Sequence, residues 1–377
     1  MPFAPAAKLL QRLLGVAVAE ATVRRTTERA GAAYVAAQTA AVERLERCLP
    51  PAPAGPERQQ LSVDGAMVPL VGGEWAEVKT LAIGTLPAAG AAPGRLTDRS
   101  YFSRMTGHET FGRLATVETH RRGTETAGIV VAVVDGADWI QGFLDLQCPT
   151  AVRVIDWIHA SSYVVQAGQA LFGAGTAATS EWLAVQLTAL RTGDPEHVLA
   201  ALRQEQDRLA PAGESPALAV VQTSLAYLEK RKEQIRYAAF VAEGYPIGSG
   251  VVESANKLVV EARLKGAGMH WARTHVDPMV ALRTAVCSDR WEEAWGQMQL
   301  RLRQEAHQRT RLPRAVRKPA PPTAHLTPEA SPPPPPPAQP AATARPRART
   351  IINGRPTHDH PWKQGPTVHP RSATPKL

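Results

Sequence analysis

The sequence predicts an α/β fold built on a mixed β-sheet. Residues 60–63 and 66–71 alternate apolar and polar side chains with period two, and 75–83 follows after a Gly-Gly pair, which predicts a hairpin. The run 128–134 is continuously apolar and rich in β-branched residues, as in a strand buried on both faces. A helix and a short strand over 151–155 come next. This order of elements predicts parallel and antiparallel strands in one sheet.

Helical patterns surround these strands. Residues 98–123 are predicted to be helical, and another helix begins at about Trp139. From 160 to about 240 the chain is rich in Ala, Leu, Gln, Glu and Arg with almost no β-branched clusters, which predicts an all-helical insertion. A turn at 244–250 then precedes a long helix over 251–265.

The two ends of the chain differ from this central region. Helical segments before and after Gly15 give the outline of a helix-turn-helix, although any two amphipathic helices around a glycine share that outline. A Pro/Gly-rich segment at 50–57 predicts a boundary. From Pro313 onward, repeated prolines predict disorder. The predicted organisation is a helical region with a candidate helix-turn-helix at 1–55, the first part of the sheet domain at 56–160, the helical insertion at 161–243, the last part of the sheet domain at 244–310, and a disordered basic Pro-rich tail at 311–377.

The positive charge of the chain is concentrated in its tail. The formal net charge of the 377 residues is +9. Residues 311–377 hold eleven Lys/Arg and two acidic residues, so they account for all of it. The preceding 310 residues hold 32 of each sign, so a polyanion-binding surface there requires local clustering rather than bulk excess.

Composition also limits the class of protein. The three cysteines, Cys48, Cys148 and Cys287, are far apart and odd in number, which favours neither a disulfide framework nor a CxxC zinc site. No apolar stretch is long enough for a membrane helix, and the first residues lack the features of a signal peptide. We therefore expect a cytoplasmic protein with no membrane partner.

Three carboxylates stand where strands and a helix meet polar turns. Asp64 is predicted to end the strand QQLSVD, Asp135 ends GIVVAVVD, and Glu253 lies in the first turn of the helix after GSG. Such carboxylates are costly to bury unless they are paired or bind a cation. An Asp-Gly after a strand is most often a simple turn, and for any one of these sites alone a turn is the favoured interpretation. Their combination favours a metal site.

The segments around these carboxylates resemble a known family. They read SVDGA at 62–66, VVDGADWI at 133–140 and VRVIDWIHA at 152–160. Further on, the chain has YPIGSGVVESANKLVVEARLKGAGMHW at 245–271 and DRWEEAW at 289–295. Together they resemble the ISKra4 family of insertion-sequence transposases, which are related to Mutator-like enzymes. The resemblance spans most of the chain before the tail.

The resemblance implies an RNase H-like fold and a DDE transposase. In this family pattern Asp64, Asp135 and Glu253 are the catalytic residues and the metal ligands. The enzyme cleaves the element end and joins it to target DNA. Mg²⁺, with Mn²⁺ as a substitute, is the expected cofactor because hard oxygen ligands favour these ions over zinc. The expected partners are double-stranded DNA, as element ends and as target, and further copies of the chain in a homo-oligomer.

The second metal ligand has a rival. Asp156 also ends a strand, and Asp156 with His159 resembles the D(2)H element of Mutator-like relatives. We favour Asp135 as the ligand, with Asp156 and His159 structural or DNA-positioning. A plain histidine near the sheet edge is an equal interpretation of His159.

Several residues are expected to contact DNA. On the helix after Gly250, Glu253, Asn256 and Lys257 are spaced to share one face, so the last two would point into the same cleft. Trp271 is either a core residue or a platform on which a base stacks. The predicted DNA-binding residues are Arg24, Arg25, Asn256, Lys257, Arg263, Lys265 and Trp271.

Two other classes of function compete with the transposase. An RNase H-like nuclease would cleave DNA without joining it. A truncated transposase remnant would bind DNA without cleaving it, and the apparent lack of a cysteine-bearing upstream region is consistent with that alternative. The presence of all three carboxylates favours an active enzyme.

Overall fold

The computed structural model describes residues 1–88, 90, 96–311, 351–352 and 355–356. The chain divides into two compact units, Met1–Pro313 and Arg314–Leu377. In its described part, the second unit holds two short paired strands, β6 (Ile351–Ile352) and β7 (Arg355–Pro356). The predicted disordered tail otherwise lies outside the described residues, apart from Arg311.

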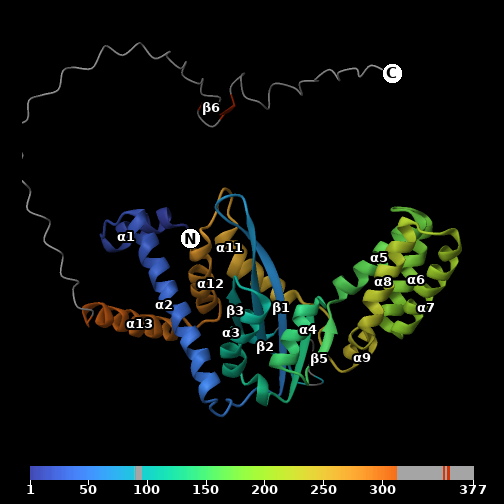
Figure 1. The fold of residues 1–377 in the computed structure, drawn as a ribbon, viewed down its shortest axis with the longest axis horizontal. Helices are drawn as coiled ribbons and strands as arrows, with labels where there is room; N and C mark the ends of the chain where they lie inside the picture. The colour runs from blue at the N-terminus through green and yellow to red at the C-terminus, as the bar shows by residue number, and fades with distance from the viewer. Residues whose placement is uncertain (89, 91–95, 312–350, 353–354, 357–377) are drawn as a thin grey trace, which may run out of the picture. The chain divides into compact units, whose positions relative to one another are not determined.

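The first unit is built around a five-stranded mixed sheet with strand order β3-β2-β1-β4-β5 (Figure 1). β1 pairs antiparallel with β2, and β2 pairs antiparallel with β3. β4 joins β1 in parallel, and β5 joins β4 in parallel. The predicted α/β class with a mixed sheet is therefore confirmed. The strands are β1 (Arg58–Pro69), β2 (Trp75–Thr85), β3 (Thr97–Arg104), β4 (Ile129–Val134) and β5 (Val152–Ile155).

Two expectations about strands are wrong. β1 runs without a break through Asp64, so this residue does not end a strand, because every residue over 59–69 pairs with β2. Residues 98–104, expected to be helical, lie in β3, and helix α3 (His108–Arg121) starts after them. β3 buries Tyr101 and Phe102 in separate core clusters, so pairing with β2 overrides the local helical pattern.

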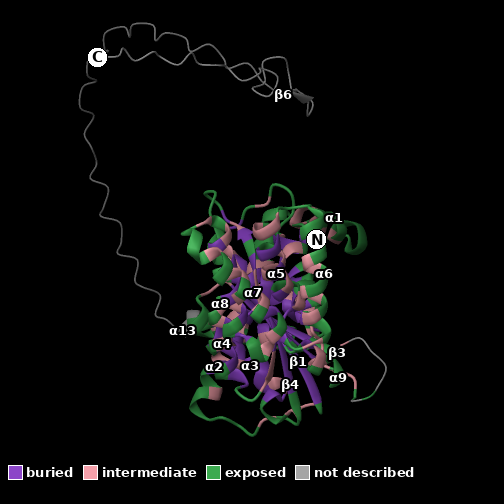
Figure 2. Cartoon of the chain, turned by 90° about the vertical axis from the view of Figure 1, so that its right-hand side faces the viewer, coloured by how far each residue is buried: buried purple, intermediate pink, exposed green. Residues whose placement is uncertain are grey.

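Both faces of the sheet are covered, and the buried residues follow the strands (Figure 2). In β4, Val130, Ala132 and Val134 pack with α3 and α4 (Asp138–Gln147). The alternate residues Val131 and Val133 pack with the insertion helices on the other face. The burial on both faces predicted for this strand is confirmed.

The region predicted as a helical insertion forms a group of helices packed beside β5 (Figure 1). Most of these helices begin at a residue whose side chain accepts a backbone N–H, namely Asp156, Thr176, Asp194 and Ser215. Such caps satisfy N–H groups that a helix leaves unpaired at its start. The helices are α5 (Trp157–Phe172), α6 (Ala177–Thr192), α7 (Pro195–Leu209), α8 (Pro216–Lys230) and α9 (Tyr237–Ala242), with 3₁₀ turns η2 (Ala210–Ala212) and η3 (Lys232–Gln234). Another 3₁₀ turn, η1 (Thr124–Thr126), precedes β4.

The last part of the sheet domain covers the face formed by β1, β2 and β3. The predicted long helix is present in three consecutive pieces, α10 (Gly250–Ala255), the π-helical turn η4 (Asn256–Glu261) and α11 (Ala262–Leu264). Apolar side chains of this helix and of α12 (Arg273–Cys287) pack on alternate residues of β1 and β2. Helix α13 (Trp291–Arg311) completes the first unit.

The N-terminal helices are α1 (Phe3–Leu14) and α2 (Glu20–Arg47), separated at Gly15 as predicted. Helix α2 packs along α12 and α13. A Cβ atom on Gly31 would lie 2.3 Å from the carbonyl oxygen of Pro278, so only glycine permits this crossing. Helix α2 is therefore fixed to the sheet domain.

Candidate functional site

Three aspartates lie level with one another at one edge of the sheet. In the parallel β1–β4 pairing Leu61 is opposite Ala132, and extending this register by three residues sets Asp64 beside Asp135. In the β4–β5 pairing Val134 is opposite Ile155, and extending it by one residue sets Asp135 beside Asp156. β4 and β5 end here, whereas β1 continues. Asp64 is therefore accessible because the neighbouring strand β4 has ended, while β1 and β2 continue to pair past it.

Asp64 is half-buried and held by two donors. Its Oδ1 accepts the backbone N–H of Gly65 at 2.7 Å, and its Oδ2 accepts Nδ2 of Asn256 at 2.9 Å. Burial raises the pKa of Asp64, and the charge of Asp135 raises it further, against the lowering effect of the hydrogen bonds and of His159. Burial and the nearby Asp135 therefore both disfavour the charged form of Asp64.

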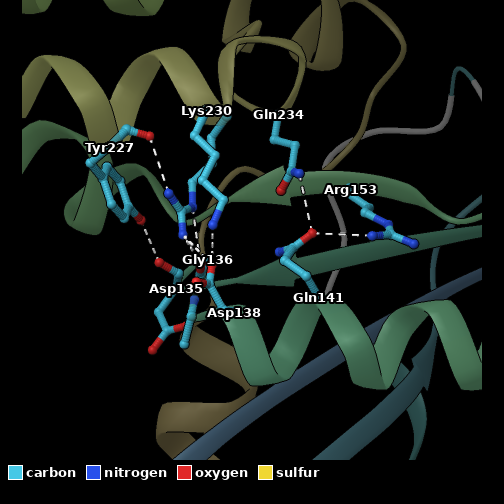
Figure 3. Close-up of polar contacts among 10 residues, drawn as sticks. Asp135, Gly136, Asp138, Gln141, Arg153, Tyr227, Lys230 and Gln234 are labelled. Atoms are coloured by element: carbon cyan, nitrogen blue, oxygen red, sulfur yellow. Dashed lines mark hydrogen bonds and ion pairs between the residues drawn. The ribbon is translucent and has the colours of Figure 1, made fainter.

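Asp135 lies in a turn that the helical insertion braces (Figure 3). Its Oδ1 accepts the backbone N–H of Ala137 at 2.8 Å. From α8, the hydroxyl of Tyr227 donates to the carbonyl oxygen of Asp135, and just beyond this helix Nε of Arg231 donates to the carbonyl oxygen of Gly136 at 2.9 Å. The insertion thereby fixes the backbone that carries the Asp135 carboxylate.

The brace is itself held by stacking and ion pairing. The rings of Tyr163 and Tyr227 stack at 3.7 Å between centroids, and the guanidinium of Arg231 lies over the Tyr227 ring at 4.1 Å. Nζ of Lys230 pairs with Oδ1 of Asp138 at 2.7 Å (Figure 3). Sequence reasoning missed these residues. The signal available was the spacing of Tyr227 and Arg231, which sets them on one helical face.

A second chain of contacts extends the brace along α4. Gln141 Oε1 accepts Nε2 of Gln234 and Nη1 of Arg153, each at 3.2 Å (Figure 3). Because Arg153 lies on β5 and Gln234 on η3, these bonds join the sheet, α4 and the end of the insertion.

Asp156 is buried and fully engaged as a helix cap. Its Oδ1 accepts the backbone N–H of His159 at 3.1 Å, and its Oδ2 accepts the backbone N–H of Ser249. Burial opposes the charged form, but the hydrogen bonds from His159 and Ser249 hold the pKa of Asp156 well below its usual range. Both carboxylate oxygens are therefore occupied, which supports the structural role that the sequence favoured for Asp156.

His159 is exposed beside this cap. Its Nδ1 lies 3.5 Å from Oδ1 of Asp156. The hydrogen bond to Asp156 raises the pKa of His159, and the charges of Asp135, Asp156 and Asp64 raise it further. The protonated form of His159 is therefore favoured near the carboxylates, although burial opposes it.

Glu253 lies on α10 at the same edge but is exposed. Oγ of Ser249 donates to its Oε1 at 3.3 Å. The same Ser249 binds Asp156 through its backbone N–H, and Asn256, one turn further along, binds Asp64. These bonds place the start of helix α10 between Asp64 and Asp156. Across the described residues, no three His, Cys, Asp or Glu side chains are gathered closely enough to hold a metal ion.

The residues expected to contact DNA are divided between surface and core. Lys257 is exposed, as Glu253 is, whereas Asn256 is buried and its side chain donates to Asp64. A π-helical turn begins at Asn256. Lys265 is exposed and pairs with Glu261 at 2.8 Å.

Trp271 and Arg263 are buried instead of forming a surface. Trp271 packs in the core cluster of α10–α12, and its Nε1 donates to the carbonyl oxygen of Leu264 at 3.1 Å. The core alternative is therefore correct for Trp271. Arg263 is only 5% exposed, and its guanidinium lies over the Trp271 ring. Arg24 and Arg25 are both exposed on α2.

No protein-family model matches the chain, and no curated protein matches it. Among the described helices, none is both long and apolar enough to cross a membrane.

Proposed function

We propose that this chain is a DDE-type DNA transposase that cleaves the ends of an insertion sequence and joins them to target DNA. The observation that carries the proposal is the convergence of Asp64, Asp135 and the Glu253-bearing helix at one edge of the sheet. An antiparallel three-strand unit followed by two parallel strands supports an RNase H-like fold. The motifs that resemble the ISKra4 family indicate which reaction this site would catalyse. A homo-oligomer would hold two DNA ends together.

The proposed cofactor is Mg²⁺, with Mn²⁺ as its substitute, because the candidate ligands are carboxylate oxygens. Asp64 has a raised pKa because it is buried next to the charge of Asp135, and a divalent cation would relieve both penalties. Glu253 now bonds Ser249, and rotation of its exposed side chain would supply the third oxygen ligand. When bound, such ions activate the attacking water or 3′-hydroxyl and stabilise the leaving oxygen.

The remaining residues would position these ligands. Asn256 holds one oxygen of Asp64, and Tyr227 and Arg231 hold the backbone of the Asp135 turn. The exposed Lys257 would attract DNA phosphate near Glu253. These contacts support a preorganised site, because groups held in place do not have to be ordered during the reaction.

The second candidate is a DNA-binding protein that does not cleave. The exposure of Glu253 and its bond to Ser249 favour it, because the three carboxylates are not gathered in the described structure. This alternative predicts that the protein binds element ends and leaves them intact with either metal.

Cleavage by matched variants tests the proposal. Purified protein is incubated with Mg²⁺ or Mn²⁺ and a labelled duplex carrying the end of its own genetic element. We expect the wild type to cut the end and transfer it, and Asp64→Asn, Asp135→Asn and Glu253→Gln to abolish both steps while remaining folded. The control is Asp145→Asn, an exposed carboxylate on α4 paired with Arg153, which should retain activity.

The outcomes separate the candidates. Binding without cleavage in either metal would replace the transposase with the DNA-binding protein, and cleavage without joining would indicate a nuclease. If Asp156→Asn loses activity while Asp135→Asn stays active, Asp156 would replace Asp135 as the second metal ligand.

A further inference from the structure

A cavity of ≈ 590 Å³ lies where helices α2 and α3 end beside each other. The last two turns of α2 and the last turn of α3 line it, together with Pro50 from the segment after α2. The segments that follow these helices lead into the amino ends of β1 and β4, whereas Asp135 follows the carboxyl end of β4. The cavity is therefore separate from the carboxylates. Its volume is within the range of about 300–1,000 Å³ that is typical of small-molecule pockets.

The uncharged part of the lining is mostly apolar. Ala41 and Leu45 lie one turn apart on α2, and Val117 contributes from α3. Ala41 and Val117 also belong to the hydrophobic cluster that joins α3, α4 and the sheet, so the core of the protein fixes this part of the cavity. An apolar body bound against these residues would be removed from water, which stabilises binding.

The charged part of the lining is basic. It consists of Arg44, Arg47, His120 and Arg121, and none of the described residues that line the cavity is acidic. Acidic side chains outside the lining pair with His120 and Arg121 at 3.1 and 3.3 Å. Within the described part of the chain, Arg44 and Arg47 have no such partner, although Nε of Arg47 donates to a backbone carbonyl of its own helix at 3.1 Å. Two arginines at this cavity therefore lack an anion.

Ordinary helix termination explains only part of this arrangement. Arg44 and Arg47 lie in the last turn of α2, where basic side chains interact favourably with the helix dipole. That interaction does not require an apolar cavity beside them. The nearby carboxylate of Glu46 is already engaged, because Arg113 donates to both of its oxygens at 2.6 and 2.7 Å. The charge at the cavity is therefore complementary to an anion from outside the chain.

We propose that this cavity binds an amphiphilic organic anion. Its apolar body would pack on Leu45 and Val117, and its carboxylate or phosphate would accept hydrogen bonds from Arg44 and Arg47. The spacing of the two arginines sets them on one helical face, and the donors of arginine match the oxygens of such groups in pairs. The basic segment 311–377 has the wrong sign of charge to bind here, and a DNA backbone would leave the apolar lining without a partner. The site is additional to the proposed transposase activity and does not rest on it.

A fluorescent anion and a reporter cysteine test the proposal. The probe is anilinonaphthalene sulfonate, and phenylnaphthylamine is its neutral analogue without the sulfonate. Cys48 lines the cavity and is exposed, so its alkylation by iodoacetamide reports occupancy at this place. With the probe at about ten times its dissociation constant, alkylation of Cys48 in the full chain should slow by about elevenfold, because only the free fraction reacts. Peptide mass spectrometry measures this rate, and the rate at Cys287 should not change.

Matched arginine variants test the contribution of charge. Arg44→Gln should weaken binding of the probe by about tenfold, the loss of a charge-assisted hydrogen bond. The control is Arg29→Gln, because Arg29 is also an exposed arginine of α2 but does not line the cavity. It should leave the affinity unchanged. The neutral analogue should bind the wild type more weakly than the anion does, and Arg44→Gln should not alter its affinity.

Each contrary outcome removes a defined part of the proposal. Unchanged alkylation of Cys48 at a saturating concentration of the probe would overturn the cavity as the binding site. Equal protection by the anion and the neutral analogue, or equal effects of Arg44→Gln and Arg29→Gln, would overturn the recognition of an anion. Protection of Cys48 by duplex DNA but not by the probe would replace the organic anion with DNA. Cleavage of DNA at the carboxylates is measured separately, so these outcomes leave the transposase proposal unaffected.

Discussion

Gly136 provides a sharp test of the brace around Asp135. Its φ is +82°, a backbone conformation that residues with a Cβ rarely adopt. A Cβ atom there would lie 2.6 Å from Nε of Arg231, 2.8 Å from the hydroxyl of Tyr227 and 2.8 Å from Cδ1 of Ile155. Gly136→Ala therefore both strains the backbone and forces the brace away from the turn.

The cost can be worked out from these two effects. A left-handed conformation costs a residue with a Cβ about 1–2 kcal/mol. Insertion of a methyl group into a packed site costs about 1–3 kcal/mol. The free energy of unfolding should therefore fall by about 2–5 kcal/mol.

Urea unfolding of the wild type and of Gly136→Ala measures this change from the shift in midpoint at unchanged slope. The matched control is Gly213→Ala, because Gly213 has φ +85° and a Cβ added to it would meet no atom within 4 Å. It should lose only the backbone contribution of about 1–2 kcal/mol. An equal loss of unfolding free energy in the two variants would refute the conclusion that a Cβ at position 136 collides with Tyr227 and Arg231.

Three further predictions concern the same edge of the sheet. Asp156→Ala should lower the free energy of unfolding by about 2–4 kcal/mol, because it removes a helix cap and leaves the buried N–H of Ser249 unpaired. Thermal unfolding measures this loss. A loss of only about 1 kcal/mol, as for an ordinary exposed cap, would contradict the prediction. Because the pKa of Asp64 is raised on folding, its ionisation destabilises the protein as pH rises above the usual range for Asp. Asp64→Asn should therefore raise the metal-free melting temperature at pH 7 but not at pH 3, and a gain at both pH values would be inconsistent with this cause. Tyr227→Phe should cost about 1–3 kcal/mol in urea unfolding by leaving the carbonyl of Asp135 unpaired, and no change would mean that water replaces the hydroxyl.

Local patterns were sufficient for much of the fold. The alternation in β1 and β2 predicted their hairpin, and the apolar run of β4 predicted a strand buried on both faces. β3 was missed because its residues pair with an edge that only β2 provides. Strand propensity depends on such neighbours more than helix propensity does, so the sequence of residues 97–104 was insufficient.

The candidate site was predicted in part. Asp64 and Asp135 were selected because each was predicted to end a strand, which is wrong for Asp64, and the parallel register of β1 and β4 sets them level. The spacing on the helix after Gly250 suggested that Asn256 faces DNA, whereas it binds Asp64 across 192 residues. That hydrogen bond depends on a strand far away in the sequence, so helical spacing alone was insufficient to predict it.

The sequence by itself determined the class of sheet, the helical insertion and the carboxylates that could serve chemistry. The alternation of apolar residues and the positions of turn residues are local, and each is readable from a few neighbours. Only the tertiary structure decided that Asp156 caps a helix, that the end of α8 braces Asp135, and that Arg263 is buried with an unpaired donor. Burial and hydrogen-bond partners depend on segments far apart in the chain, and these contacts set the cost of each charge.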